Sequence, residues 1–374
     1  MRDLTAMMEL PSAAGATPTL REARTLLDPD LFRPRPWLYW ADLGLSAAIG
    51  WSALVAAALR ARPDAETAVL VVVAAFAFLR AVLFIHEISH FKKGAMPGFE
   101  AAWNLVVGVP MLVPSVSYAS HLDHHRKLLY GTIRDPEYLP LGLMGRGRIF
   151  GFVLETLLVP LLLVVRFGVI GPLSLLVPPL RAVVEERLSS LVINPSYRRP
   201  RPRGRERAIW WGLEILMLVW IAAVAAAVAT GRLSWRALVV WYAVAALVAF
   251  VNQIRTLAAH HYRNPGAPVD TGTQLLDSIN VRGMPFLTEL VFPVGLKYHA
   301  LHHFVPDMPY HGLAAAHARL MEALPADSRY RETEEAGGWA AIARLWRDAA
   351  GGRGAPETWR EGAEVLMPRE ERRR

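Results

Sequence analysis

Long apolar stretches alternate with short polar segments along the chain. Four of these stretches are each close to the roughly 20 residues that a helix needs to cross a bilayer. They occur in two pairs, and each pair is joined by a short polar turn. We therefore expect two transmembrane helical hairpins, formed by residues 38–59 with 68–85 and by residues 208–230 with 235–254.

Two further apolar stretches interrupt this pattern. Residues 101–119 contain Pro110 and Pro114, and residues 149–180 carry Gly171-Pro172 near their middle. Proline breaks a helix interior, so neither stretch resembles a plain transmembrane helix. We expect both to leave the membrane on the face where they entered it, as re-entrant or interfacial segments.

The sequence becomes polar after Pro306 and predicts helices at residues 312–324 and 338–350. The second helix is amphipathic and could lie in the membrane interface or cap the membrane domain; we favour the cap. The predicted fold class is all-α integral membrane, with a cytoplasmic helical cap. Its three parts are a cytoplasmic N-terminal tail (1–36), a membrane domain (37–318) and a cytoplasmic C-terminal helical tail (319–374).

Composition supports a membrane protein. Of the 374 residues, 53% are hydrophobic, and the mean hydropathy is +0.25. The net charge of +8 comes with arginines clustered beside apolar stretches, six of them within residues 198–207. Such clusters mark the cytoplasmic side and attract anionic lipid head groups, so we expect contact with membrane lipid and no nucleic acid.

Three histidine boxes carry the chemistry. Histidines spaced three or four residues apart lie on one face of a helical turn. Neutral imidazole binds iron, zinc, copper and nickel, whereas magnesium and calcium prefer oxygen ligands. The boxes are His86-Glu-Ile-Ser-His90, His121-Leu-Asp-His124-His125 and His299-Ala-Leu-His302-His303.

A ninth histidine is expected from the pair His260 and His261. If both lie on a helix they point about 100° apart, so only one of them reaches the metal. One ion takes about four protein ligands, and nine imidazoles therefore indicate two metal ions. His311 and His317 are expected to lie outside the site.

The first box also permits other functions. His-Glu-x-x-His on a helix is typical of zinc proteases, with the glutamate as general base, so an intramembrane zinc protease is one alternative. Another is a membrane protein that binds metal without turnover. Neither explains all three boxes, because a protease needs only one further ligand and transporter sites lie near the bilayer midplane.

From His86 to His303 the chain resembles the membrane fatty acid desaturases, a superfamily that also contains membrane hydroxylases. The first box is closer to sphingolipid and bacterial acyl-chain desaturases than to the His-Asp-Cys-Gly-His form of plant enzymes. The sequences Arg255-Thr-Leu-Ala-Ala-His260 and His302-His303-Phe-Val-Pro306 also resemble bacterial members.

The resemblance implies a catalytic domain with two non-haem iron ions, facing the cytoplasm from a bacterial inner membrane. The fatty acyl substrate would lie in a tunnel between helices and be oxidised by dioxygen. We expect desaturation first, with hydroxylation or oxidative decarboxylation to a terminal alkene as alternatives. The implied iron ligands are His86, His90, His121, His124, His125, His260, His299, His302 and His303.

Electrons would come from an external donor, because the chain contains no cysteine to hold an iron–sulfur cluster. A ferredoxin or a small cytochrome with its reductase is implied by the resemblance. Family members also place an asparagine four residues before the histidine that precedes the last box, where it holds a metal-bound water. Thr256 stands at that spacing here, with Asn252 and Asn264 nearby.

Two acidic residues lie inside the boxes. Glu87 and Asp123 each point about 100° away from the preceding residue of a helix. We expect them to form hydrogen bonds to ligand rings and so to fix their orientation. The alternative is that each faces solvent.

Overall fold

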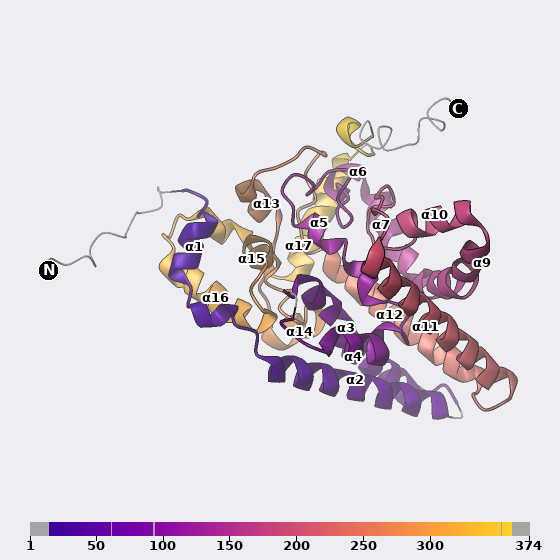
Figure 1. Ribbon diagram of the computed structural model, residues 1–374. Coiled ribbons are helices and arrows are strands. Elements are labelled where there is room, and N and C mark those ends of the chain that lie inside the picture. Colours follow the sequence, from indigo (N-terminus) through magenta and orange to yellow (C-terminus); the bar gives the residue numbers. More distant parts are fainter. Residues whose placement is uncertain (1–14, 61, 93, 353, 361–374) are drawn as a thin grey trace.

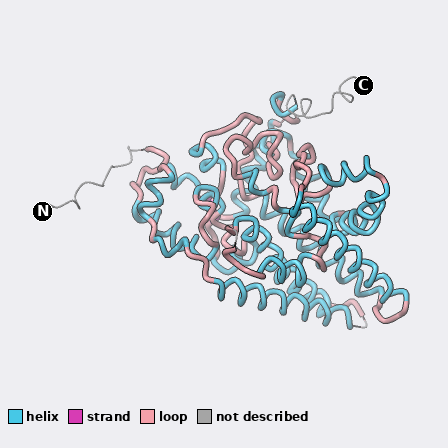
Figure 2. The backbone as a smooth tube through the Cα atoms, in the orientation of Figure 1, coloured by secondary structure: helices cyan, strands magenta, loops and turns pink. Residues whose placement is uncertain are grey.

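A computed structural model describes residues 15–60, 62–92, 94–352 and 354–360 (Figure 1). This part of the chain is mostly helical, as the tube in Figure 2 shows. Its one sheet consists of two short parallel strands, β1 (Asn280–Val281) and β2 (Glu334–Glu335). The predicted helical class is confirmed.

Four long helices carry most of the apolar sequence. α2 (Pro36–Leu59) is followed by α3 (Ala65–His90), and α11 (Gly204–Ala229) by α12 (Trp235–Thr256) (Figure 1). The Asp64 side chain accepts a hydrogen bond from the Thr67 backbone N–H and so caps α3. α3 is longer than predicted, because the first histidine box continues its last turns.

α2 and α3 pack closely through a shared core. Phe78 of α3 is fully buried, and a Cβ on Gly50 of α2 would lie 3.1 Å from its ring carbons. The absence of a side chain at Gly50 therefore lets the two helices approach. Val244 of α12 belongs to the same cluster. The outward faces carry exposed Leu45, Val55 and other apolar side chains, as expected of a surface in contact with lipid.

Five helical stretches of the described chain are long and apolar enough to cross a membrane. Four are the long helices, and the fifth covers residues 159–176. Residues 159–176 lie within the stretch 149–180. That stretch was predicted to be re-entrant or interfacial, and not to cross the membrane. It divides into several short helices: α7 (Arg146–Leu154), η5 (Glu155–Leu157), α8 (Val159–Val165), the π-helix η6 (Arg166–Ile170), α9 (Gly171–Leu176) and α10 (Pro178–Arg187).

Residues 101–119 form no long helix. They comprise the end of α4 (Phe99–Trp103), the π-helix η3 (Asn104–Gly108) and the 3-10 helix η4 (Ser115–Tyr118). The indole N–H of Trp103 donates to the Ala81 carbonyl of α3 at 2.7 Å, and the segment packs into the α2–α3 core. Pro110 and Pro114 interrupt the helix, as expected; the re-entrant path itself stays a prediction.

The remaining elements are short helices outside the four long ones. α16 carries the helix predicted at 312–324, and α17 the helix predicted at 338–350. α17 buries Ala341 and Leu345 and leaves Trp339 exposed. These elements are α1 (Leu20–Leu26), η2 (Pro29–Phe32), α5 (His121–His124), α6 (Leu141–Met144), α13 (Thr271–Asp277), α14 (Pro285–Val291), α15 (His299–Phe304), α16 (Tyr310–Ala323), η7 (Arg329–Thr333), α17 (Gly338–Asp348) and η8 (Ala349–Gly351).

A buried ion-pair network joins α11 to the short helices beside it. The Glu214 carboxylate accepts from Arg166 Nη2 and from Arg181 Nη1, each at 2.6 Å. All three side chains are nearly buried. Removing the carboxylate would leave Arg166 without a counter-charge in an apolar setting and Arg181 with Glu185 alone, which is costly.

We therefore expect Glu214→Gln to destabilise the fold by about 3–5 kcal/mol, the cost of breaking a buried ion pair. The matched control is Glu186→Gln, which removes an exposed partner of Arg201 and should cost less than about 1 kcal/mol. Thermal unfolding of both variants in detergent measures the difference. Equal melting temperatures for the two variants would contradict a structural role for the network.

Candidate metal centre

The three boxes come together in the structure, although they lie in distant parts of the chain. The first box lies in the last turns of α3, the second begins α5, and the third begins α15. His260 follows the end of α12. Together these segments place nine histidine rings in two groups.

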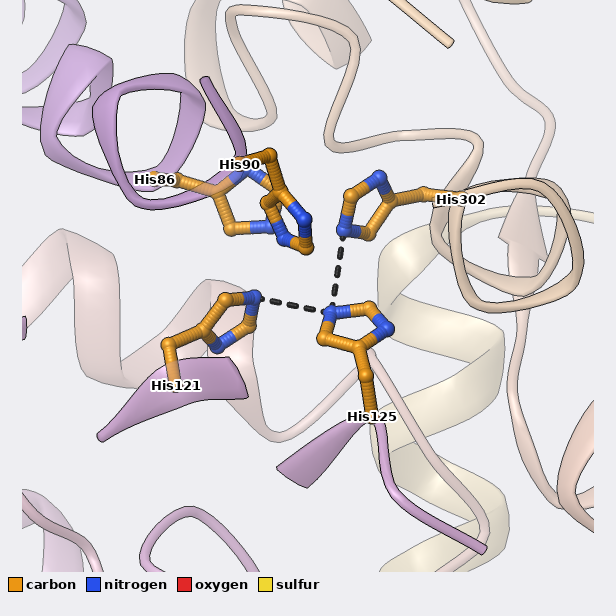
Figure 3. A group of neighbouring side chains, drawn as sticks. All are labelled: His86, His90, His121, His125 and His302. Carbon is orange, nitrogen blue, oxygen red and sulfur yellow. Dashed lines mark hydrogen bonds between the residues drawn. The ribbon is translucent and has the colours of Figure 1, made fainter. Parts of the chain in front are cut away.

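The first group contains five rings, which point toward a common space from three elements (Figure 3). One ligand atom from each lies within 4.8 Å of all the others. Nε2 of His125 is 2.9 Å from Nε2 of His121 and 3.1 Å from Nε2 of His302. The members are His86, His90, His121, His125 and His302.

The second group contains four buried rings: His124, His260, His299 and His303. Nε2 of His260 lies 3.2 Å from Nε2 of His124 and 2.9 Å from Nε2 of His299. Nε2 of His303 lies 3.1 Å from that of His299. The second and third boxes therefore each contribute to both groups, which places the two groups side by side.

His260 joins the centre, and His261 does not belong to either group. The expectation that both lie on a helix is wrong, because α12 ends at Thr256 and three turn residues come next. His260 instead forms a β-bridge with Ser278, and the His261 backbone N–H donates to the Asp277 carbonyl at 2.7 Å. This pairing holds the His260 ring toward the other three.

Two carboxylates orient rings of the second box. Nδ1 of His124 lies 2.9 Å from both carboxylate oxygens of Asp135, which is fully buried. Nδ1 of His121 lies 2.7 Å from Oε1 of Glu137. A carboxylate accepts the Nδ1–H of each ring, and the lone pair is then on Nε2. Both rings thus present a bare Nε2 to their group.

His260 is fixed in the same tautomer by two hydroxyl groups. Its Nδ1 lies 2.9 Å from the Tyr130 oxygen and 3.2 Å from the Ser278 oxygen. Tyr130 donates its proton to Asp277, and Ser278 donates to the Gln274 carbonyl. Both oxygens can therefore only accept from the His260 Nδ1–H, which leaves Nε2 of His260 without a proton.

The neutral state of the rings results from their environment. Burial lowers the pKa of His125, His299 and His302 well below the ordinary value, so these rings carry no charge near neutrality. Burial acts in the same direction on His124, but the Asp135 carboxylate outweighs it and raises the pKa of His124. Neutral imidazole is the form that ligates metal.

These rings fit metal ions better than they fit one another. Nε2 of His124 and of His260 face each other at 3.2 Å with no proton between them, and both nitrogens of His86 lack a hydrogen-bond partner. A cation would satisfy these lone pairs. Ligand nitrogens roughly 2.1 Å from one ion and at right angles lie about 3 Å apart, which matches the spacings within each group.

The two acidic residues inside the boxes have other partners. Glu87 accepts from the Tyr39 hydroxyl at 2.6 Å, and its nearer oxygen is 3.8 Å from Nδ1 of His86, beyond hydrogen-bond distance. Asp123 accepts from Tyr197 and pairs with Arg126. Asp135 and Glu137, ten or more residues beyond the second box, hold the rings instead. The sequence shows only that these two residues are acidic. It does not show that they are buried beside the rings.

Thr256 lies next to the centre. It lines a cavity of about 20 Å³ together with His86, His124 and His260, and a site of that size can hold a water molecule. The Asn264 side-chain amide, in contrast, donates to the Tyr130 and Ala267 carbonyls and so stabilises a loop. Asn252 accepts from Arg255.

A larger apolar cavity of about 280 Å³ lies between α3, α8 and α12. Its walls are mainly aliphatic, with Leu79, Val82, Leu163 and Val248 among them. Tyr118, Glu137, Arg255 and Thr256 line both this cavity and the small one beside the histidines. The apolar cavity is therefore adjacent to the small cavity beside the histidines.

Comparison with known proteins identifies the same region. The model of a family described as fatty acid desaturase matches residues 65–334. A ceramide hydroxylase from Caulobacter vibrioides (strain NA1000 / CB15N) is 41% identical over 329 residues, which cover 87% of this chain and 93% of the relative. Both matches include all three boxes and His260.

The neighbours His260 and His261 give a matched test of the second group. We expect His260→Ala to lower the bound metal by about one ion per chain, because four ligands become three. His261→Ala should keep the full metal content, since its ring lies outside both groups. Elemental analysis of the purified variants decides this, and a full complement in His260→Ala would remove His260 from the site.

Asp135 and Asp123 give a second matched pair. Asp135→Asn should weaken metal binding about 10- to 100-fold, the usual effect of losing the partner that orients a ligand ring. Asp123→Asn should leave it unchanged, because Asp123 contacts Tyr197 and Arg126 rather than an imidazole. Competition with a chelator measures both. Weaker metal binding in Asp123→Asn than in Asp135→Asn would instead indicate that Asp123 orients a ligand ring, as first expected.

Proposed function

Because the chain belongs to the fatty acid desaturase family and is an oxidoreductase of that type, we propose that it inserts a hydroxyl group into the acyl part of a ceramide-type lipid. The observation that carries the proposal is the pair of histidine groups at the end of an apolar cavity. We propose that these groups hold two non-haem iron ions.

Hydroxylation takes the place of the desaturation expected first from the boxes. The boxes favour neither outcome, but the relative covered along almost its whole length is a hydroxylase. The intramembrane zinc protease and the metal-binding protein without turnover fall away, since the family consists of oxidoreductases. No specific observation favours the terminal alkene.

The reaction explains why the site is made of metal ligands. A methylene C–H bond is not acidic, so no side-chain base can begin its oxidation. Iron bound by the nine histidines would supply the activation of dioxygen and the removal of hydrogen from carbon. Hydroxylation of one carbon consumes one dioxygen, two electrons and two protons, and it releases one water.

The protein's own residues position the ligands and the substrate. Asp135, Glu137 and Tyr130 keep Nδ1 of three rings protonated, which directs the bare Nε2 atoms inward. The aliphatic walls of the cavity would hold the lipid chain and exclude water from the reacting carbon. No base or nucleophile is needed in this account.

The remaining parts of the expectation are proposals of the same kind. We propose that the centre faces the cytoplasm from a bacterial inner membrane, since the arginine-rich stretch 198–207 lies between the helical regions on that predicted side. We also propose that an external ferredoxin or small cytochrome delivers the electrons, because the chain has no cysteine.

Mass spectrometry of ceramides from cells that express the protein under ¹⁸O₂ tests the proposal. We expect a hydroxylated ceramide that carries one ¹⁸O atom, because the hydroxyl oxygen comes from dioxygen. The variant His302→Ala, which loses a ligand of the first group, should give none. A product two hydrogens lighter, with no added oxygen, would instead establish desaturation.

A further inference from the structure

Arg255 is a buried charge without a counter-charge. Its side chain is at the end of α12 and the residue is only 7% exposed. Nε donates to Asn252 Oδ1 at 3.1 Å, and Nη2 donates to Thr256 Oγ1 at 3.2 Å. Among the residues that the structure describes, Arg255 forms no ion pair, and its side-chain hydrogen bonds use Nε and Nη2 but not Nη1.

The order of the lining residues shows where Arg255 lies in relation to the two cavities. Residues of α12 between Ala245 and Thr256 line the apolar cavity. Arg255, Thr256 and the residues that follow α12 as far as His260 line the small cavity beside the histidines. Along α3 the same order runs from Leu79 to His86. Arg255 therefore stands at the inner end of the apolar cavity, next to the centre.

A guanidinium at this place requires an explanation. Burying an unpaired charge in an apolar setting is unfavourable. The nearest acidic side chain on the cavity wall, Glu137, already accepts from the His121 ring and the Tyr118 hydroxyl. The end of a helix favours a basic residue, but that effect is small and needs no burial. An oxygen acceptor from outside the chain would satisfy the free Nη1.

We propose that Arg255 binds the carbonyl or hydroxyl oxygen at the polar end of the lipid, so that oxidation takes place on the carbons nearest that end. The inference rests on the proposed function. The hydrocarbon tail then extends away from the centre along α3 and α12, between the aliphatic walls. In the opposite orientation the apolar tail would lie against an unpaired guanidinium, which is unfavourable.

Substrate chain length tests this orientation in the unaltered protein. Ceramides with acyl chains of different lengths are fed to expressing cells, and the hydroxyl position is found by tandem mass spectrometry. Binding at the polar end predicts that the hydroxyl keeps the same distance from the carbonyl in every chain. A hydroxyl that keeps its distance from the methyl end would overturn the inference and leave the proposed function intact. Without any hydroxylated product, the proposed function itself fails.

Variants of Arg255 test the contact itself. Arg255→Met keeps the length of the side chain and removes its donors, and Arg255→Lys keeps the charge. We expect Arg255→Met to raise the apparent KM in isolated membranes by roughly 10- to 100-fold, the range for a lost hydrogen bond to a charged group. The residual product of Arg255→Met should carry the hydroxyl at several carbons. In Arg255→Lys, hydroxylation should be partly restricted to a single carbon again.

Two controls separate binding from folding. Arg319→Met removes an exposed arginine of α16 and should change neither KM nor position. The iron content of Arg255→Met should equal that of the unaltered protein, because Arg255 is not a ligand. An Arg255→Met enzyme with unchanged KM and a single hydroxyl position would overturn the inference. Free fatty acid in place of ceramide, hydroxylated at the same distance from its carboxylate, would show that a carboxylate serves as the acceptor.

Discussion

The structure depends on satisfying many buried imidazole nitrogens that converge in one place. Nine rings converge there, and partners such as Asp135 and Tyr130 take up the Nδ1 protons of several of them. Nε2 atoms of neighbouring rings lie 2.9–3.2 Å apart, and in the neutral tautomers those of His124 and His260 face each other as two bare lone pairs. Without a cation such an arrangement repels itself and leaves polar atoms unsatisfied. Two metal ions are the natural solution.

This constraint explains how the rest of the chain is organised. α3 extends beyond the expected membrane stretch in order to bring the first box to the centre. α12 stops short of His260, and the β-bridge to Ser278 then turns that ring inward. The same two helices line the apolar cavity, so the elements that carry the histidines also form the wall of the proposed lipid site.

Much of this could be predicted from the sequence, because the relevant signals are local. Apolar length identified four of the five candidate spans, and the three-and-four spacing of histidines identified eight of the nine rings that the structure brings together. Two of the misses are long-range. Asp135 reaches His124 through a loop, and the end of α12 before His260 is fixed by pairing with a distant segment. Neither has a periodic pattern. The fifth candidate span, residues 159–176, was interpreted as part of a returning segment because Gly171-Pro172 interrupts its apolar sequence. In the structure a π-helix also lies within it.

The choice between hydroxylation and desaturation also lies beyond the boxes. Both reactions begin by removing a hydrogen from carbon. Hydroxylation then adds oxygen to that carbon, whereas desaturation removes a second hydrogen from its neighbour. The ligand set is thus shared, and the outcome depends on how the lipid lies beside the centre. We propose that Arg255 and the walls of the cavity set that position.

The central claim is that the two histidine groups each hold one iron ion. It is tested most directly by measuring the metals in protein purified from iron-supplied cells, by plasma mass spectrometry together with Mössbauer spectroscopy on ⁵⁷Fe. The account predicts two iron ions per chain, both with nitrogen-rich coordination. A single zinc per chain, with no iron, would contradict it.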